Sequence, residues 1–239
     1  MNELLLVIEV VLTFGAVVLA KRLFGKAGLM AWTAVAMILA NLTVVKCVPM
    51  FGLDVTLGNV MFASTFLATD MIVELYGDKE AKQSILMGVC ATVCFMVCTQ
   101  ITLSYAPTAF DIAQEPMAAL FALNLRSSVA SIACCMLANL ADVWVYKKIR
   151  EATKGKYMGF RSSFAAILCN CVENFLFMFL AFGGLYEPVE IIVMALTTCA
   201  IEGVLGLCNP PFLYLATWEE KHGERTELDT ELRANGERA

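Results

Sequence analysis

Acidic side chains occur inside the long apolar segments of this sequence. Asp70 and Glu74 lie four residues apart within the segment 57–76, while Glu173 and Glu202 lie within two later apolar segments. A charged side chain at the centre of a bilayer costs roughly 2.5–3.5 kcal/mol on insertion scales, so these carboxylates are expected to face the interior of a helix bundle. There they can accept hydrogen bonds from a bound solute or take up protons.

Asparagines accompany these acids at helical spacing. Asn139 precedes Asp142 by three residues. Asn170 precedes Glu173 by the same spacing, so each pair shares one face of a helix. Since an Asn amide both donates and accepts hydrogen bonds, the pattern predicts a polar substrate cavity. The predicted binding residues are Asn41, Lys46, Asp70, Asn139, Asn170, Glu173, Asn174 and Glu202. Those predicted to couple or gate transport are Glu74, Arg126, Asp142 and Asn209.

Some of these polar residues also have a purely structural interpretation. Glu74 and Asp142 lie near one end of their segments, where they could reach the membrane surface or pair with Lys79 or Lys147. Asn139 could serve only as a hydrogen-bonding contact between helices. Both interpretations remain open from the sequence.

The composition indicates a membrane protein with many spans. Of 239 residues, 59% are hydrophobic and 16% are charged, against about 45–50% and 25% in soluble domains. Because about 20 apolar residues suffice to cross a bilayer, we predict an all-α transmembrane helix bundle of six to seven spans over 1–218. A charged cytoplasmic tail, 219–239, is expected to be disordered. The apolar segments are roughly 4–20, 28–51, 57–76, 83–105, 125–146, 161–184 and 188–216.

Basic residues alternate between the connections. The connections after the first, third and fifth segments and the tail, together with Arg161 at the edge of the sixth segment, hold 15 of the 17 lysines and arginines. Since cytoplasmic loops are enriched in these residues, the N-terminus is predicted outside and the C-terminus inside. If the first segment, which contains Glu9, does not cross, the N-terminus lies inside instead. The sequence Asn209-Pro210-Pro211 is expected either to end a helix within the last segment or to act as a gate.

Metal and cofactor sites are not expected. The ten cysteines contain no Cys-x-x-Cys spacing, and the single histidine, His222, lies in the polar tail. The cysteines are therefore interpreted as small apolar packing residues. No Walker-type glycine-rich loop and no nucleophile–base pair occur, which argues against ATP binding by that route and against an enzyme. No nucleic-acid partner is expected.

The polar pattern restricts the class of solute. A carboxylate pair in a low-dielectric pocket suits a ligand with adjacent N–H donors, such as a guanidine-like or purine-like edge. Abundant phenylalanine, with Trp32, Tyr76 and Trp144, could supply stacking faces. The residues alone therefore predict a transporter for a small, flat solute that is rich in donors or cationic.

Five stretches resemble the successive motifs of one family. They are ANLTVVK (40–46), STFLATDMIVELYGDKEAK (64–82), ANLADVWVYKKIR (138–150), FRSSFAAILCNCVENFLF (160–177) and EGVLGLCNPPFLYLATWEEK (202–221). In order and spacing they are similar to the queuosine precursor transporters, also called vitamin uptake transporters. The resemblance implies uptake of 7-cyano- or 7-aminomethyl-7-deazaguanine across the bacterial cytoplasmic (inner) membrane.

The resemblance also implies roles for the polar residues. Glu173 or Glu202 would accept hydrogen bonds from the donor edge of the deazapurine. Asp70 would couple transport to protons or orient the substrate. The acceptors of the substrate would be held by Asn41, Lys46, Asn170 and Asn174. The family commonly has Gln-x-x-Asp where this sequence has Asn139-x-x-Asp142 and Asn170-x-x-Glu173. The shorter amide and longer acid alter the reach of the site and leave the preferred precursor open.

Two modes of action fit the sequence. The chain could act alone as a secondary transporter coupled to protons, or as the substrate-capture subunit of an energy-coupling-factor vitamin transporter with separate ATPase chains. The expected partners are the deazapurine and the lipid bilayer, and homo-oligomerisation is left open.

Overall fold

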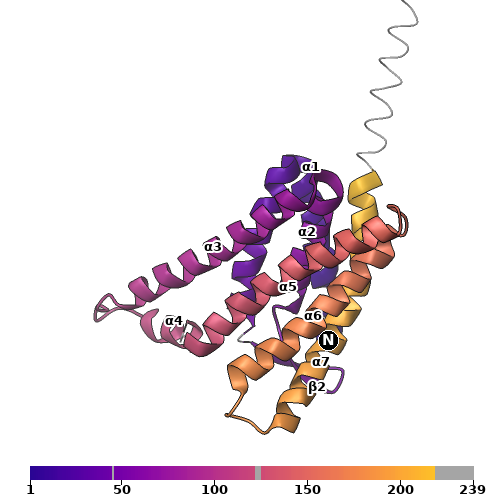
Figure 1. Cartoon of the computed structure of the whole chain (residues 1–239). Coiled ribbons are helices and arrows are strands. Elements are labelled where there is room, and N and C mark those ends of the chain that lie inside the picture. The colour runs from indigo at the N-terminus through magenta and orange to yellow at the C-terminus, as the bar shows by residue number, and fades with distance from the viewer. Residues whose placement is uncertain (45, 122–124, 219–239) are drawn as a thin grey trace, which may run out of the picture.

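The computed structural model describes residues 1–44, 46–121 and 125–218 and shows a bundle of long helices (Figure 1). The long helices are α1 (Asn2–Thr43), α3 (Asp78–Leu103), α5 (Leu125–Ala152), α6 (Met158–Phe182) and α7 (Pro188–Leu207). Between them lie α2 (Asn59–Tyr76), the short α4 (Gln114–Leu120) and a hairpin of β1 (Cys47–Met50) and β2 (Leu53–Thr56). Five helices in the described residues are long and apolar enough to cross a membrane. The predicted helical membrane fold is confirmed at this level.

Helix α1 folds back on itself at Gly25. A straight helix of 42 residues would be about 63 Å long, yet the Asn2 side chain donates a hydrogen bond to the carbonyl of Pro49, six residues beyond the far end of α1. Gly25 has φ 57° and ψ −134°, a conformation that favours glycine because a Cβ atom would be strained there. The two arms, 2–24 and 26–43, therefore run in opposite directions, as the first two apolar segments of the sequence indicate.

The second arm of α1 ends earlier than the sequence predicts. The apolar segment 28–51 was expected to be one helix containing Lys46, but the helix ends at Thr43 and Lys46 is exposed beyond it. Pro49, which lacks an N–H, lies in β1, and the two-residue turn Phe51-Gly52 has both φ values positive. That backbone is typical of a type I′ hairpin turn, and the register pairs Met50 with Leu53. The proline and the turn residues of this stretch therefore set its backbone structure, although its apolar side chains alone predict a helix.

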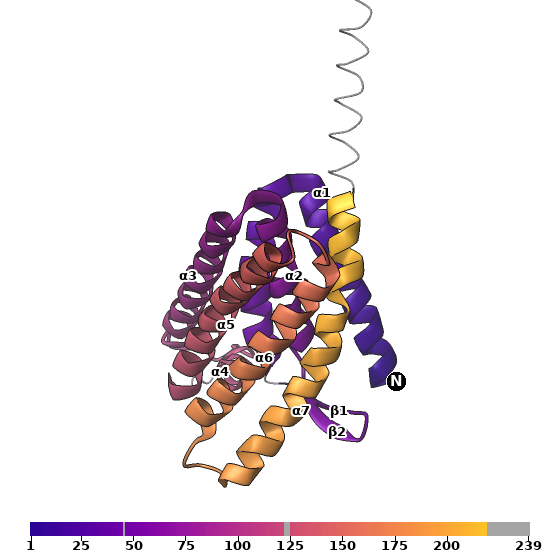
Figure 2. The same cartoon turned by 45° about the vertical axis from the view of Figure 1, so that its right-hand side comes forward.

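The basic connections meet at one end of the bundle, which we call the basic end. Lys26 pairs with Glu80 at 2.9 Å, and Lys147 pairs with Asp78 at 3.1 Å. Lys21 donates to the carbonyl of Ala216 at 3.1 Å, which brings the last described turns to the same end. The opposite end, which we call the hairpin end, carries β1, β2, α4, the α6–α7 connection and the N-terminus (Figures 1 and 2).

Helix α2 lies inside the bundle. It contacts α1, α3, α5, α6 and α7, and its residues from Ala63 to Val73 are buried without a break. A helix enclosed by other helices does not need an apolar surface toward lipid. This explains why α2 can carry Asp70 and Glu74 and is not among the five helices apolar enough to span by composition.

The outer surface is apolar and the centre holds polar side chains. Large apolar residues are exposed along α1, α3, α6 and α7, which is the distribution expected where lipid replaces water. They include Leu5, Leu12, Leu86, Val93, Val97, Ile101, Val172, Leu180, Val193, Leu196 and Val204. Buried polar residues include Asp70, Asn139, Asp142, Arg161, Asn170, Asn174, Glu202 and Asn209.

Helix α7 ends at Leu207, next to Asn209-Pro210-Pro211, as one interpretation of this sequence predicts, but a further helical stretch resumes at Asn209. The helical path runs from Pro188 to Trp218 with one interruption at Cys208. The two prolines occupy the first turn of the resumed helix, where the backbone N–H groups have no partner within the helix. Proline is compatible with that position.

Candidate functional site

A cavity of about 410 Å³ lies in the half of the bundle nearer the hairpin end. Its walls come from the C-terminal turns of α1, α3 and α6, the N-terminal turns of α2 and α5, the middle of α7 and the end of α4. A volume of this size is within the range of small-molecule sites. The polar lining residues are Asn41, Asn59, Thr99, Gln100, Ser131, Glu173, Asn174, Thr198 and Glu202.

The two carboxylates of the cavity differ in their hydrogen bonding. Glu202 on α7 is buried and accepts a hydrogen bond from the Asn174 amide at 2.6 Å. Glu173, one residue before Asn174 on α6, is only half-buried and receives no hydrogen bond within the described part of the chain. One carboxylate is thus fixed by the protein, while the other is available to a ligand.

Asn41 is held in place at the end of α1. Its amide nitrogen donates to the carbonyl of Met37 at 2.8 Å, and its amide oxygen accepts from the Ser131 hydroxyl at 3.0 Å. The remaining lone pair of that oxygen can still accept a donor from the cavity. Asn41 thereby links α1 to α5 across the cavity wall.

Aromatic rings make up much of the remaining lining. Phe95 and Phe121 meet edge to face, with ring centroids 5.8 Å apart. The Gln100 side chain donates to the carbonyl of Phe121 at 3.1 Å, which fixes the segment after α4 against α3. Phe62, Phe177 and Phe182 also face the cavity. Such rings can stack on a flat heterocycle.

A second group of acids lies outside the cavity, toward the basic end. Asp70 on α2 accepts a hydrogen bond from the Ser162 hydroxyl on α6. Asp142 on α5 faces Asp70 and is completely buried. We call Asp70 and Asp142 the aspartate pair. Between this pair and the cavity wall, Asn139 accepts from the Thr65 hydroxyl at 3.2 Å.

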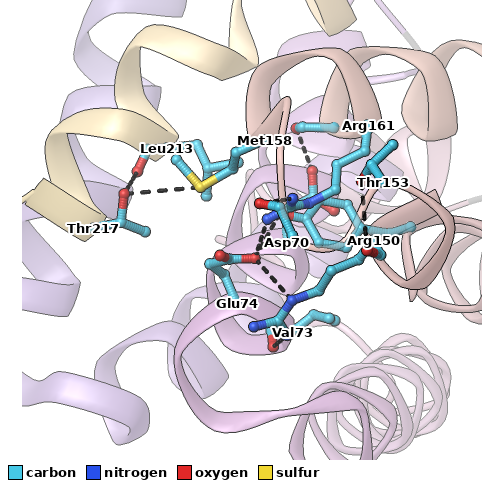
Figure 3. Close-up of polar contacts among 12 residues, drawn as sticks. Asp70, Val73, Glu74, Arg150, Thr153, Met158, Arg161, Leu213 and Thr217 are labelled. Carbon is cyan, nitrogen blue, oxygen red and sulfur yellow. Dashed lines mark hydrogen bonds and ion pairs between the residues drawn. The ribbon is translucent and has the colours of Figure 1, made fainter. Parts of the chain in front are cut away.

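The basic end is closed by a cluster that we call the arginine layer, formed by Glu74, Tyr146, Arg150 and Arg161. The Arg161 guanidinium, which is completely buried, pairs with Glu74 and lies 4.9 Å from the centre of the Tyr146 ring. Arg150 approaches the same carboxylate at 3.6 Å, and the Tyr146 hydroxyl donates to it at 3.2 Å. Figure 3 shows both arginines directed at Glu74.

The partners of Glu74 correct one interpretation of the sequence. One interpretation of the sequence pairs Glu74 with Lys79 or Lys147, but Glu74 pairs with Arg161 and Arg150, and Lys147 pairs with Asp78. The sequence identified Arg161 only as one of the basic residues that mark a cytoplasmic connection. Its position at the start of α6 instead directs the side chain inward between α2 and α5.

A second hollow of about 500 Å³ lies at the basic end, beyond the arginine layer. Glu74 contributes to its wall, so this carboxylate lies between the hollow and the buried aspartates. The other lining residues are Gly155, Tyr157, Met158, Pro211, Tyr214, Leu215, Thr217 and Trp218.

Comparison with known proteins identifies the family. The family described as "Putative vitamin uptake transporter" matches residues 56–216, more than half of the chain. The chain belongs to the vitamin uptake transporter family. A curated relative from Bacillus subtilis (strain 168), named "Probable queuosine precursor transporter", is 30% identical over 217 residues, which cover 90% of this chain and 95% of that protein. No solved structure matches the chain.

These matches confirm the predicted class of protein. This member of the vitamin uptake transporter family is a multi-pass membrane transporter and not an enzyme. The cavity acids Glu173 and Glu202, the aspartate pair and the arginine layer all lie within the matched region, whereas Asn41 precedes it.

The structure divides the predicted binding residues of this vitamin uptake transporter between several places. It brings four of them together in the cavity: Asn41, Glu173, Asn174 and Glu202. Four others do not line the cavity: Lys46, Asp70, Asn139 and Asn170. The expectation of one shared chamber thus differs from the arrangement found, in which Asp70 belongs to a separate buried layer.

The residues predicted to couple or gate transport also lie apart. Glu74 is in the arginine layer, Asp142 is in the aspartate pair, and Asn209 is buried where the last helix is interrupted. The side chain of Arg126 falls outside the part of the chain that the structure describes. The Asn170 and Asn209 amides have no hydrogen-bond partner within the described residues.

Several cavity residues were not singled out in the sequence. Gln100 and Ser131 lie within apolar segments, and Asn59 lies at the start of α2. The only signal in the sequence is their polarity inside otherwise apolar runs. Many neutral polar residues share that property, because they can bond to the backbone of their own helix.

Proposed function

We propose that this transporter imports a 7-deazaguanine precursor of queuosine, 7-cyano- or 7-aminomethyl-7-deazaguanine, across the bacterial cytoplasmic membrane. The name of the Bacillus relative supports the substrate class. The observation that carries the proposal is the Glu173 carboxylate, which receives no hydrogen bond from the described residues and lies beside the fixed Glu202 in a cavity of about 410 Å³ with aromatic walls.

The chemistry of a guanine edge matches these groups. Its ring N1–H and 2-amino group are adjacent donors that one carboxylate can accept together, and Glu173 is placed for that role. The 6-oxo group needs a donor, which the second N–H of the Asn174 amide can supply beside Glu202. The flat ring system would lie against Phe62, Phe121 or Phe177 in the wall.

In the proposed topology the chain crosses the membrane seven times. The crossings are the two arms of α1, then α2, α3, α5, α6 and the long last helix. The gathering of basic connections at one end supports a cytoplasmic basic end, with the N-terminus outside and the C-terminus inside. The cavity would then occupy the outer half of the bundle, and the arginine layer would close the inner half.

We further propose that the chain is a secondary transporter driven by the proton gradient. Collapsing that gradient with an uncoupler should then stop accumulation of the precursor. If an ATPase and a scaffold protein instead copurify with the chain, and uptake follows ATP, the chain acts as the capture subunit of an energy-coupling-factor system.

The direct test uses cells that cannot synthesise the precursor. Labelled 7-cyano-7-deazaguanine is supplied to cells with and without this chain, and queuosine is measured in their tRNA. Wild type should restore queuosine, and Glu173→Gln should abolish it at equal membrane abundance. Glu151→Gln, at a carboxylate that is 55% exposed at the end of α5, is the matched control and should behave as wild type. Queuosine at the wild-type level in Glu173→Gln would remove Glu173 from the site.

A further inference from the structure

We propose that the aspartate pair, Asp70 and Asp142, is a proton-binding site separate from the solute cavity, loaded from the outer side and emptied toward the inner side in each transport cycle. This inference rests on the proposed transport function and names the residues that would carry its coupling ion. It begins with two buried carboxyl groups that the solute cavity does not use.

The geometry of the pair leaves hydrogen-bonding capacity unused. The exposed fractions of Asp70 and Asp142 are 1% and 0%. Asp70 receives one hydrogen bond, from Ser162, and its other oxygen has no donor among the described residues. Neither oxygen of Asp142 has a donor there, and this side chain is directed at Asp70, within hydrogen-bonding reach.

A proton is the ligand that completes this arrangement. Two ionised carboxylates so close together in a buried site repel one another, and each loses its hydration without compensation. One shared proton turns one carboxyl group into a donor for the other and satisfies an oxygen on each side. Buried carboxyl dyads that share a proton are a recurring arrangement in proteins.

The surrounding charges favour one shared proton. Arg161 and Arg150 carry two positive charges beside Glu74, which carries one negative charge. With a single proton on the aspartate pair, the pair also carries one negative charge, so the whole group is neutral. Adding a second proton or removing the first leaves a net charge inside the bundle, which is costly. The other titratable side chains facing the pair are Tyr146 on α5 and Cys169 on α6.

The pair lies between the two hollows of the molecule. Along α6, Ser162 and Glu173 are eleven residues apart, about 16 Å, which separates the pair from the free cavity carboxylate. Toward the cavity, Asn139 and Thr65 form a polar step, and Asn139 donates to the carbonyl of Cys135, whose side chain lines the cavity. Toward the basic end, Glu74 borders the second hollow. A proton can therefore arrive from one side and leave from the other.

The site also suggests how proton and solute are linked. Helices α5 and α6 contribute to both places, since Cys135 and Glu173 line the cavity while Asp142 and Ser162 belong to the buried layer. A movement of α6 that closes the cavity around a solute would shift Ser162 relative to Asp70. Loading of the pair and occupation of the cavity would then favour the same conformation, which is the requirement for coupling.

The test uses the purified full chain in liposomes with labelled 7-cyano-7-deazaguanine. With an inward proton gradient, wild type should accumulate the label above the outside concentration. Asp142→Asn should lose this accumulation, so that the inside-to-outside ratio falls to unity, while exchange of label against unlabelled precursor stays measurable. The control Asp111→Asn replaces an exposed aspartate after α3, where the new amide oxygen can still accept the hydrogen bond from the N–H of Ala113. It should accumulate the label as wild type does.

A second measurement does not depend on transport. In pH-difference infrared spectra, the carbonyl band of a protonated carboxylic acid should be present in wild type and in Asp111→Asn. It should disappear in both Asp70→Asn and Asp142→Asn, each checked for a single symmetric elution peak.

Three outcomes would overturn the proposal: proton-driven accumulation by Asp142→Asn at the wild-type ratio, an unchanged carboxylic-acid band in both variants, or accumulation that follows a sodium gradient and not a proton gradient. If wild type fails to bind any deazaguanine, the proposed function fails, and the infrared spectra still decide whether the pair holds a proton.

Discussion

The cavity and the arginine layer contain similar side chains in opposite states. In the cavity, Glu173 has no hydrogen-bond donor among the described residues and faces open space. In the arginine layer, the Glu74 carboxylate is contacted by Arg150, Arg161 and Tyr146. The hairpin-end half of the bundle therefore offers polar groups to a ligand, while the basic-end half uses them to hold α2, α5 and α6 together.

This difference shows how one bundle can be receptive at one end and closed at the other. A buried polar group that lacks a partner costs free energy, and in the cavity a bound solute can remove that cost. In the arginine layer, groups of the same kind are cross-linked to one another. In the proposed transport cycle, the arginine layer would loosen once the cavity is filled.

The largest effect is expected from a substitution in the arginine layer, which closes the basic-end half of the bundle. Arg161→Met removes a completely buried charge and leaves Glu74 with only the half-exposed Arg150 as an ionic partner. Removing one member of a buried ion pair costs about 3–5 kcal/mol, so the purified protein should lose much of its thermal stability. Thermal denaturation followed by size-exclusion chromatography measures this loss. Arg150→Met, at a side chain that is 39% exposed, is the control and should cost under about 1 kcal/mol.

The next effect concerns the fixed carboxylate of the cavity. Asn174→Ala removes the 2.6 Å hydrogen bond to the buried Glu202, and an unsatisfied buried acceptor costs about 1–3 kcal/mol. Precursor affinity, measured by equilibrium binding to the purified protein, should fall about tenfold or more. Asn174→Asp, which replaces the donor by a second acid, should be worse than alanine. Equal affinities in Asn174→Ala and wild type would show that the fixed state of Glu202 does not matter.

A smaller effect is expected from the aromatic wall. Phe121→Ala removes a ring that packs edge to face on Phe95, and an aromatic contact contributes about 0.5–1.5 kcal/mol beyond area burial. The affinity for 7-cyano-7-deazaguanine should fall severalfold with little change in thermal stability. Phe121→Leu keeps most of the side-chain volume but removes the flat aromatic face. It therefore distinguishes a contribution from stacking on the substrate from one that comes only from filling the cavity wall.

The smallest effect on binding is expected from Ser131→Ala, and its comparison with Asn41→Ala tests the role of Asn41. Ser131→Ala frees the Asn41 carbonyl from its 3.0 Å hydrogen bond, and a typical hydrogen bond contributes about 0.5–1.5 kcal/mol. Asn41→Ala should weaken binding more than Ser131→Ala does, because it removes the acceptor as well as its support. Identical binding constants for the two variants would reduce Asn41 to a link between α1 and α5.

The sequence predicted much of the chemistry because acids inside apolar segments have few structural uses. Glu173, Asn174 and Glu202 were recognisable from residue type and from helical spacing alone, and the structure brings them to one cavity. Their depth along the bundle was harder to predict. Asp70 and Glu173 both lie near the middle of their segments, but they end up in different layers because helix boundaries and tilts set the height at which each helix contributes.

Local backbone chemistry and side-chain direction limited the rest of the prediction. The turn at Phe51-Gly52 ends an apolar run that otherwise reads as membrane helix, and this moves Lys46 out of the bundle. Arg161 was counted among surface charges because nothing in one sequence distinguishes an arginine that snorkels from one that turns inward. Its burial follows from a tertiary arrangement that brings Glu74 and Tyr146 to the same height.

The reversal of α1 at Gly25 has a practical consequence for labelling experiments. It returns the first residues to the hairpin, where Asn2 donates a hydrogen bond to Pro49, whereas the last described helical stretch ends at the opposite end of the bundle (Figure 2). In the proposed topology, an epitope placed before Asn2 and one placed after Trp218 would therefore lie on opposite sides of the membrane. In intact cells, an antibody that cannot cross the membrane should reach the first epitope and not the second, and breaking the cells should expose both.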